Sequence, residues 1–584
     1  MIAVVIGLLA VPLAGAALLL LFTRAEPASG AASEPASESA SGAVEAYVPP
    51  RLAGPGWIAG PSPHWYGVAV SGITLALALV LAASFDYGRA GVAQFEVDRP
   101  WIPGLDLRFH LGVDGISLPL VVLTALLTFL CFVHLVRHRP DGGRFRALAF
   151  TLLVLEVGMI GTFLALDLLL FFVSFEIVLI PMYFVIAVWG GKDRAAAAVK
   201  FILYTLLGSA VLLLGLLVIW AHTGTLDMVA LARAHGAGMP RTVQIVAFLA
   251  VAGGLAVKAP MWPLHTWLPA AHTEAPTVGS VLLAGVLLKM GTYGFARIAI
   301  PVLPEGAAAV APWLGAFAVV GIVYGSLACL AQRDLKRMIA YSSVGHMGFV
   351  LLGLATLTPV GMNAALFGNI AHGLITGLLF FVAGAVKERY GTAELSRLGG
   401  GMLTRLPYLG SLLTFACVAS LGLPGLAGFW GEMLALLGAF DPAPGLPRPL
   451  FLVFMAIGGA GTVLTAAYFL LMLSRVTHGR ADEPIGDAGL PEEPLAETAE
   501  AAGAPRVRTP LAVAEEPVEP VATVATVAGP PDVPGPRLGW PRDVTPYELA
   551  AWSPLIVLTV ALGLWPKLLL AVTDPAVQAF LGAR

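Results

Sequence analysis

The sequence predicts an all-α polytopic membrane protein with about fourteen transmembrane helices. Hydrophobic residues make up 58% of the chain and charged residues only 12%, whereas soluble domains are usually about 25% charged. Mean hydropathy is +0.86, and apolar stretches close to the ~20 residues that cross a bilayer as a helix recur along the chain. The net charge of −3 is near balance, which gives no support for nucleic acid as a partner.

Most of the predicted spans follow one another with short connections. They fall at 2–22, 66–84, 116–136, 147–166, 168–189, 199–221, 242–261, 276–300, 309–330, 336–356, 360–386, 408–440, 449–474 and 551–572. Basic residues gather in alternate loops, which the positive-inside rule places on the inner side of the membrane. These residues are Arg137, Arg139, Arg144, Arg146, Lys192, Arg194, Lys200, Arg333, Lys336, Arg337, Lys387, Arg389, Arg397 and Arg405. Both termini are therefore expected on the outer side.

Three segments are not expected to span. Residues 92–112 alternate between apolar and charged side chains, which indicates an outer β-hairpin turning at Pro103-Gly104. Residues 24–62 and 479–546 are rich in Ala, Pro, Glu and Gly. They cannot bury enough apolar surface to offset their chain entropy, so flexible inner loops are predicted there.

The seventh predicted span contains a charge beside a helix break. Pro260 and Pro263 each remove a backbone donor within one turn after Lys258, so the helix must be interrupted there. Interrupted helices in membranes mark ion sites, because the freed carbonyls must face protein or water. The alternative is a lysine that snorkels to the inner interface near a helix end.

Two further charges lie deep in neighbouring spans. Glu176 is surrounded by apolar residues in the fifth span, and Lys289 lies in the middle of the eighth. An ionised group at this depth costs at least ~2.5–3.5 kcal/mol and usually marks a path for ions or protons. A Glu176–Lys258 pair that opens and closes would act as a proton switch. A permanently closed pair would instead be structural.

The twelfth span repeats the arrangement of a break followed by a buried charge. Pro424-Gly425 interrupts the apolar run and Glu432 follows. Spans four to eight and nine to thirteen each have a discontinuous helix fourth in order, which predicts two inverted five-helix repeats with helices 7 and 12 broken.

The domain organisation follows from these repeats. The predicted units are helices 1–3 with their loop and hairpin, the first repeat, the second repeat, a flexible Pro/Ala/Glu-rich inner loop and a final helix, at 1–146, 147–300, 309–474, 475–550 and 551–584.

Two histidines complete a possible proton path between the repeats. His346 lies in span ten and His372 in span eleven, and imidazole titrates near neutral pH. The alternative is that each histidine only forms hydrogen bonds between helices. His265 and His272, in the segment after the break, could mark a proton entrance or could cap the adjoining helices.

Metal and redox chemistry are not expected in this chain. Cys131, Cys329 and Cys417 lie singly within apolar spans, without the spacing that holds zinc or an iron–sulfur cluster. We therefore expect no metal and no cofactor in the chain.

The motif residues resemble those of a known family. The run from Val257 to Thr277, Leu287-Leu288-Lys289-Met290-Gly291, and Tyr341 to Phe349 are similar to the antiporter-like proton-translocating subunits of respiratory complex I. With a glutamate at position 432, the chain resembles the M-type subunits of NADH-quinone oxidoreductase, since the L and N types and the Na⁺/H⁺ antiporter relatives carry lysine at this position. The loops 24–62 and 479–546 look longer than is usual in the family.

The resemblance implies a role for each site residue. Glu176 would be the carboxylate partner and Lys258 the switching lysine, Lys289 and His372 the connecting relay, and Glu432 the terminal group, while His346 falls in a family-like motif. It also implies other complex I membrane subunits, including the L and N types, as partners beside membrane lipids and protons, with redox chemistry elsewhere in the complex. The location would be the bacterial inner (cytoplasmic) membrane. Alternatives are a subunit of a multisubunit Na⁺/H⁺ antiporter or membrane-bound hydrogenase, or a non-transporting scaffold.

Overall fold

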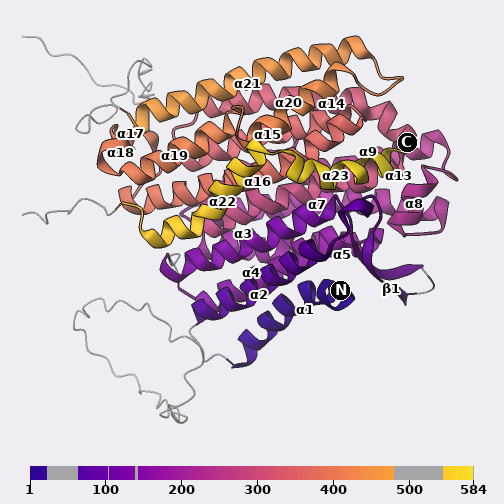
Figure 1. The fold of residues 1–584 in the computed structure, drawn as a ribbon, viewed down its shortest axis with the longest axis horizontal. Coiled ribbons are helices and arrows are strands. Elements are labelled where there is room, and N and C mark those ends of the chain that lie inside the picture. The colour runs from indigo at the N-terminus through magenta and orange to yellow at the C-terminus, as the bar shows by residue number, and fades with distance from the viewer. Residues whose placement is uncertain (23–62, 103, 105, 139–142, 479–542, 583–584) are drawn as a thin grey trace, which may run out of the picture.

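The helices of the chain form one bundle in which most run nearly parallel (Figure 1). The computed structural model describes residues 1–22, 63–102, 104, 106–138, 143–478 and 543–582. Within these residues thirteen helical segments are long and apolar enough to cross a membrane. Two shorter apolar helices, α19 (Pro407–Ser420) and α20 (Ala427–Phe440), together supply a fourteenth crossing. The prediction of about fourteen spans is confirmed.

Most spans are single helices, and four are interrupted. The uninterrupted ones are α1 (Ile2–Phe22), α2 (Pro63–Ser84), α3 (Ser117–Arg137), α4 (Phe145–Leu164), α7 (Arg194–Thr223), α14 (Pro304–Leu330), α15 (Leu335–Ala355), α16 (Pro359–Tyr390), α21 (Arg448–Val476) and α22 (Pro546–Leu564). The fifth span is divided into α5 (Leu168–Ile177) and α6 (Leu179–Trp189), and the seventh into α9 (Arg241–Lys258) and α10 (Trp267–Glu274). The predicted discontinuities in helices 7 and 12 are therefore confirmed.

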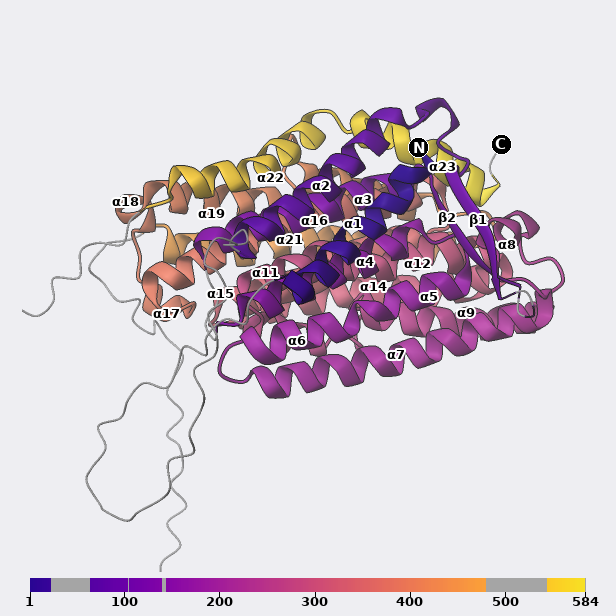
Figure 2. The same cartoon turned by 90° about the horizontal axis from the view of Figure 1, so that it is seen from below.

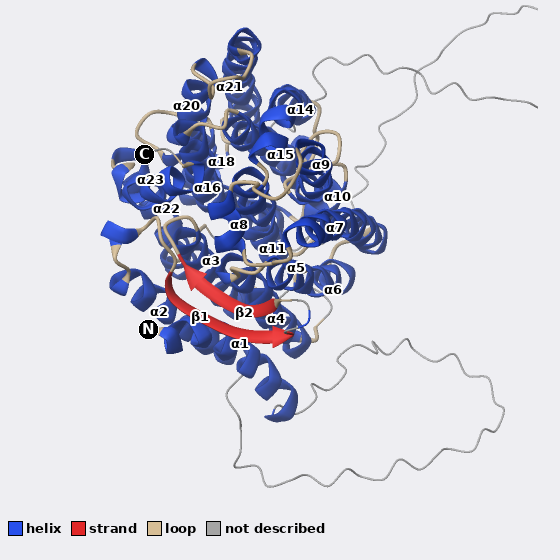
Figure 3. Cartoon of the chain, turned by 90° about the vertical axis from the view of Figure 1, so that its right-hand side faces the viewer, coloured by secondary structure: helices blue, strands red, loops and turns tan. Residues whose placement is uncertain are grey.

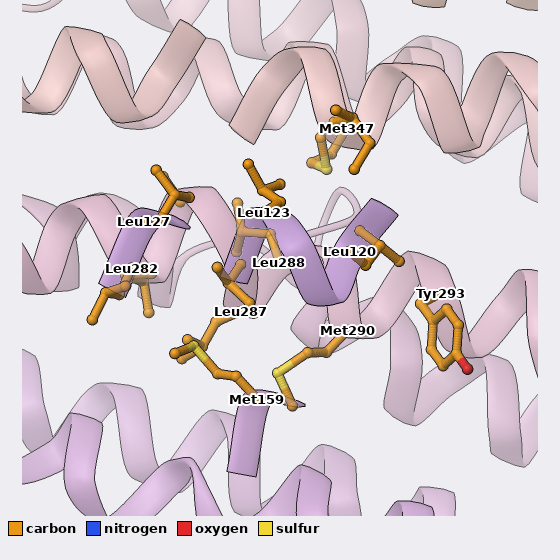
Figure 4. Packing of buried hydrophobic residues seen from close by; sticks show 14 of the residues in the cluster. Leu120, Leu123, Leu127, Met159, Leu282, Leu287, Leu288, Met290, Tyr293 and Met347 are labelled. Carbon is orange, nitrogen blue, oxygen red and sulfur yellow. The ribbon is translucent and has the colours of Figure 1, made fainter. Parts of the chain in front are cut away.

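The eighth span lies at the centre of the bundle. It runs through α11 (Thr277–Leu282), η3 (Leu283–Leu287), α12 (Leu288–Gly294), η4 (Phe295–Ala299) and α13 (Ile300–Val302), where η3 and η4 are π-helical. All of its most apolar window is buried. Leucine and methionine side chains from α3 and α4 pack around Leu287, Leu288 and Met290 (Figure 4).

The predicted β-hairpin is present at one end of the bundle. Strands β1 (Gln94–Ile102) and β2 (Leu107–Val113) pair antiparallel (Figure 3). The backbone N–H of Arg108 donates to Asp167 Oδ2 at 3.2 Å, which ties the hairpin to the start of α5. Pro103, half of the predicted turn, lies outside the described residues.

The two ends of the bundle differ in charge and in content. The hairpin, α8 (Met228–Ala234), the start of α1 and the end of α23 (Lys567–Leu581) share one end, which we term the hairpin end (Figure 2). The opposite end carries α17 (Leu395–Leu398) and α18 (Met402–Arg405) and the loops predicted to be basic, and we term it the basic end. The loops predicted to be basic thus lie together at one end of the bundle.

The C-terminal region differs from the prediction of one helix at 551–572. The helix α22 begins at Pro546, where the Thr545 hydroxyl and the Glu548 carboxylate form a capping box. It ends at Leu564, and α23 begins at Lys567 directly after Pro566, because proline cannot donate to the preceding turn. The predicted loops 24–62 and 479–546 lie almost wholly outside the described residues, apart from the cap at 543–546.

Candidate functional site

Lys289 is completely buried, two residues after the π-helical segment η3 of the eighth span. Its Nζ donates to the carbonyl oxygen of Ala284 and lies 2.6 Å from Nδ1 of His372 on α16. The close approach of the two helices depends on small residues, since a Cβ on Gly373 would lie 3.0 Å from the Gly285 carbonyl oxygen. The predicted Lys289–His372 bridge is thus a direct contact in the structure.

A second histidine continues the line. The rings of His372 and His346 meet edge to face with centroids 5.6 Å apart. His346 Nδ1 is 3.2 Å from Glu432 Oε1, and its Nε2 is 2.9 Å from the Ser420 hydroxyl. Four of the six predicted site residues, Lys289, His372, His346 and Glu432, therefore form one continuous row, in which His346 is largely buried and the other three side chains are buried.

A small cavity lies along this row. Its volume is about 30 Å³, and its polar lining comes from His346, His372, Thr376, Ser420 and Glu432. A cavity needs only about 10–15 Å³ to hold a water molecule, provided that polar partners line it. The cavity can therefore hold water between the two imidazoles and the carboxylate.

The break in the twelfth span places Glu432. Gly422 and Gly425 adopt positive φ angles of 70° and 95° between α19 and α20, a backbone conformation that residues other than glycine rarely adopt. A Cβ on Gly422 would lie 2.7 Å from Glu432 Oε2. The predicted Pro-Gly interruption thus returns the chain directly against the carboxylate.

Lys258 is the last residue of α9 and is 2% exposed. Its Nζ has no hydrogen-bond partner among the described residues and lies 4.7 Å from the ring centroid of Phe175. The Trp267 indole N–H donates to the Val257 carbonyl at 3.0 Å, which satisfies one acceptor freed by the break. This buried position does not fit a lysine that snorkels to the interface.

Glu176 lies in the last turn of α5 and is separated from Lys258. The two residues interact electrostatically, yet one oxygen of the carboxylate and the ammonium nitrogen both lack a hydrogen-bond partner in the described ranges. The interaction of Lys258 with the Phe175 ring replaces a direct ion pair. The structure therefore places Glu176 and Lys258 near each other without a direct ion pair.

The row that begins at Lys289 meets the region around Lys258 where α12 packs against the break in the seventh span. A Cβ on Gly291 would lie 2.7 Å from the backbone nitrogen of Ala259. Gly291 follows Lys289 by two residues, and Ala259 follows Lys258 directly. The missing side chain at Gly291 thus brings the two lysine-bearing segments together.

The remaining predicted histidines lie in or beside the second half of the broken seventh span. His272 is on α10, stacked on Phe380 with centroids 4.6 Å apart, while His265 packs edge to face against Tyr324 at 4.9 Å. Both are buried. Neither forms a side-chain cap in this structure.

Several buried polar groups were not predicted. Glu156 on α4 is fully buried, and neither carboxylate oxygen has a partner in the part of the chain that is described. Asp114, before α3, pairs with Arg297 in η4. Lys336 donates to the Ala275 carbonyl at 2.7 Å. Glu156 and Arg297 carried a signal, since each is a charge within a predicted span, but the contacts of Arg297 and Lys336 join residues distant in sequence.

Comparison with known proteins shows the family of the chain. Residues 165–465 match the family model described as NADH:quinone oxidoreductase/Mrp antiporter, transmembrane. The chain is 42% identical to NADH-quinone oxidoreductase subunit M of Rhodobacter capsulatus over 436 residues, 73% of this chain and 82% of that protein. It is 41% identical to NADH-ubiquinone oxidoreductase chain 4 of Arabidopsis thaliana over 414 residues, 71% of this chain and 81% of that protein.

Solved structures share the fold. A chain of respiratory complex I from Thermus thermophilus with bound NADH superposes with a TM-score of 0.73 at 26% identity, covering 99% of both chains. A chain of the Mrp complex from Dietzia sp. DQ12-45-1b superposes with a TM-score of 0.70 at 23% identity, covering 89% of this chain and 94% of that one. The chain belongs to the NADH:quinone oxidoreductase/Mrp antiporter family of transmembrane proteins, and within it to the antiporter-like M subunits of NADH-quinone oxidoreductase.

Proposed function

We propose that this chain moves protons across the membrane as a subunit of NADH-quinone oxidoreductase, through Glu176, Lys258, Lys289, His372, His346 and Glu432. The observation that carries the proposal is the buried row from Lys289 to Glu432, in which a direct hydrogen bond is followed by a cavity large enough for water. A static scaffold has no need of such a row, because each buried charge costs free energy.

The row provides a step-by-step route for a proton. Lys289 passes a proton to His372 Nδ1 across 2.6 Å. His372 Nε2 has no partner within the described residues, so it can release a proton to water in the adjoining cavity. Imidazole suits this task because it accepts at one ring nitrogen and donates from the other. His346 and Glu432 then carry the proton onward.

The separated Glu176 and Lys258 supply the switch. Closing the pair stabilises the protonated lysine, whereas opening it leaves a buried ammonium that favours proton release. In the open arrangement the Phe175 ring partly compensates the charge of Lys258, since a cation over an aromatic face gains about 0.5–2 kcal/mol. A signal that moves Glu176 therefore changes the tendency of Lys258 to release its proton.

The redox chemistry is proposed to lie in other subunits. Cys131, Cys329 and Cys417 are buried free thiols on three separate helices, and a cluster needs several thiolates at one place. The relatives of this chain are subunits of an enzyme complex. We propose that this subunit binds no redox cofactor and couples to NADH oxidation and quinone reduction through its neighbours.

The proposed setting is the bacterial inner membrane, beside the L- and N-type subunits. The basic end would face the cytoplasm, because loops rich in Lys and Arg are retained on that side. Both termini, at the hairpin end, would then face outward. Labelling of single cysteines introduced at Thr392 and Asp441 with an impermeant reagent in intact cells tests this topology. Only the Asp441 position should react.

Proton pumping in native membrane vesicles tests the function. Lys258→Met and Glu432→Gln should lower NADH-driven proton uptake at least tenfold in vesicles whose complex is assembled, as judged by native gels. Glu305→Gln, an exposed carboxylate at the start of α14, is the matched control and should pump normally. Normal pumping by both site variants would overturn the proposal and favour a scaffold.

A further inference from the structure

Three potential metal ligands converge at the basic end of the bundle, away from the proton row. His134 lies in the last turn of α3 and His138 is the C-cap of that helix, while Glu388 reaches them from α16. One ligand atom from each residue lies within 4.8 Å of the other two. Nδ1 of His138 is 2.6 Å from Glu388 Oε2, and the two imidazole rings stack with centroids 4.4 Å apart.

This donor set has a definite metal preference. Two histidines at positions i and i+4 of a helix present their nitrogens on one face, the spacing used in zinc enzymes. Imidazole nitrogen with one carboxylate suits zinc and similar ions, whereas calcium and magnesium prefer oxygen ligands alone. Zinc binds nitrogen at about 2.0–2.1 Å, so tetrahedral donors lie about 3.4 Å apart. His138 Nδ1 and Glu388 Oε2 lie 2.6 Å apart in the structure, so these two donors must separate for an ion to bind between them.

A further carboxylate is placed to orient one of the ligands. Glu548 Oε1 lies 3.3 Å from Nε2 of His138, on the side of the ring opposite to Glu388. Glu548 is itself held by Arg389, whose Nη2 lies 2.8 Å from Oε2. Metal-bound histidines usually donate their second ring N–H to a carboxylate in this manner, which fixes the tautomer and the ring orientation. Nδ1 of His138 is therefore the nitrogen available to a metal, and Nε2 is the nitrogen that Glu548 orients.

The cluster opens to a cavity, which provides both access and a free coordination position. The cavity has a volume of about 410 Å³ and is lined by His134, His138, Glu388, Glu274, Lys336 and Lys387. His134 is buried, while the Glu388 side chain is 43% exposed. An ion can thus reach the site from the aqueous side, and water can complete its coordination.

We propose that His134, His138 and Glu388 bind a divalent transition-metal ion of the zinc class, which bridges α3 and α16 at the basic end. The bridge joins two helices that enclose the π-helical segment, since a Cβ on Gly285 would lie 2.4 Å from Leu127 on α3 and 3.8 Å from the Gly373 carbonyl on α16. The absence of cysteine motifs gives no information on this site, because its ligands are histidines and a glutamate, and Glu388 is 250 residues from His138 in the chain.

Zinc binding to the purified complete complex tests the proposal. Competition with a chelator measures affinity and stoichiometry, with zinc alone as the probe. The wild-type complex should bind one more zinc ion than the His134→Gln/Glu388→Gln variant. Glu388→Gln alone should weaken binding at that site at least tenfold, whereas Glu388→His should retain it. X-ray absorption at the zinc edge should report nitrogen and oxygen at about 2.0–2.1 Å.

The control is His222→Gln, an exposed histidine on α7, which should leave affinity and stoichiometry unchanged. If the His134 substitution prevents assembly, Glu388→Gln and Glu388→His decide the question, because Glu388 is substantially exposed. Equal zinc affinity in the wild type and in Glu388→Gln would overturn the site.

Discussion

Lys289 and His372, 83 residues apart in the chain, share a 2.6 Å contact at the centre of the bundle. The Nζ of Lys289 has a second acceptor in the carbonyl oxygen of Ala284, which lies within the π-helical segment η3. The contact brings a lysine of the first repeat to a histidine of the second. Any substitution that separates these two atoms should therefore interrupt transfer between the repeats.

His372→Leu should lower NADH-driven proton uptake at least tenfold while the complex still assembles. The leucine is apolar and similar in bulk, so packing is retained, but Lys289 loses its side-chain partner and the cavity loses a polar wall. Both assembly and dye-reported proton uptake should be measured in the same vesicles. His222→Gln serves as the control. Full uptake in His372→Leu would show that protons leave Lys289 by another route.

Gly422→Ala should damage the site through Glu432. The added Cβ would lie 2.7 Å from the carboxylate, at a φ of 70° that alanine adopts only with strain, so Glu432 must move away from His346. We expect several-fold slower proton uptake with an assembled complex. Gly459→Ala is the control, because a Cβ there meets no heavy atom within 4 Å. Equal pumping by the two variants would contradict the conclusion that the break in the twelfth span positions Glu432.

Much of the fold could be predicted from the sequence, because the signals are local. Pro260 and Pro263 end α9 at Lys258, and the run through Pro424 separates α19 from α20. The spans and the hairpin follow from hydropathy and alternation in the same way. The final helix was predicted as continuous although Pro566 divides it, since a single proline inside an apolar run is common in membrane helices.

The site could be predicted only in part. Lone charges in apolar runs identified Glu176, Lys258, Lys289 and Glu432, because the cost of burying them is visible in the sequence. The pairing of Asp114 with Arg297 across 183 residues, and the separation of Glu176 from Lys258, depend on helix packing and side-chain rotamers. The π-helical turns of the eighth span contain no proline, so they could not be predicted from the sequence either. Tertiary contacts decide these features.

The docking of the hairpin should depend on pH through His110 and Asp227. Burial alone would lower the pKa of His110, but hydrogen bonds to Asp227 at 2.9 Å and Glu96 at 3.0 Å outweigh it and raise the pKa above 6.5. Burial alone would raise the pKa of Asp227, and the bond to His110 contributes to holding it below 3.8.

The sign of the effect follows from these two shifts. The raised pKa of His110 contributes stability that is complete below pH 6.5 and is lost as pH rises through the folded value. The contribution of Asp227 is present above pH 3.8 and is lost as pH falls through its lowered value. Hydrogen exchange of residues 94–113, corrected for intrinsic rates, should be slower at about pH 6 than at about pH 9.

His110→Gln should remove most of this pH dependence, because glutamine keeps a polar side chain but cannot gain a proton. The exchange of α8, which carries Asp227 at its N-cap, should respond in parallel with the hairpin. Exchange of α21, at a distance from the hairpin, provides an internal control in the same sample. An unchanged pH dependence in His110→Gln would assign the effect to other groups.

The pair of Asp114 and Arg297 should be strongly coupled in stability. Both side chains are almost fully buried, and Asp114 also accepts the backbone N–H groups of Ile116 and Ser117 at the start of α3. Arg297→Met leaves the carboxylate buried without its counter-ion, which should cost about 3–5 kcal/mol. Asp114→Asn/Arg297→Met retains an acceptor for the helix start without the charge. The second substitution should therefore restore much of the stability that Arg297→Met removes. Thermal unfolding of the complex measures this.

The exposed pair of Asp98 and Arg108 is the matched comparison. Its side chains are 37% and 36% exposed, so water screens the attraction and Arg108→Met should destabilise the protein far less than Arg297→Met does. A double-mutant cycle on each pair separates the interaction from the effects of the single changes. The buried pair should give the larger coupling energy, since removal of one partner there exposes the other to an apolar interior. Equal coupling energies would mean that water reaches Arg297 through the neighbouring cavity of about 330 Å³.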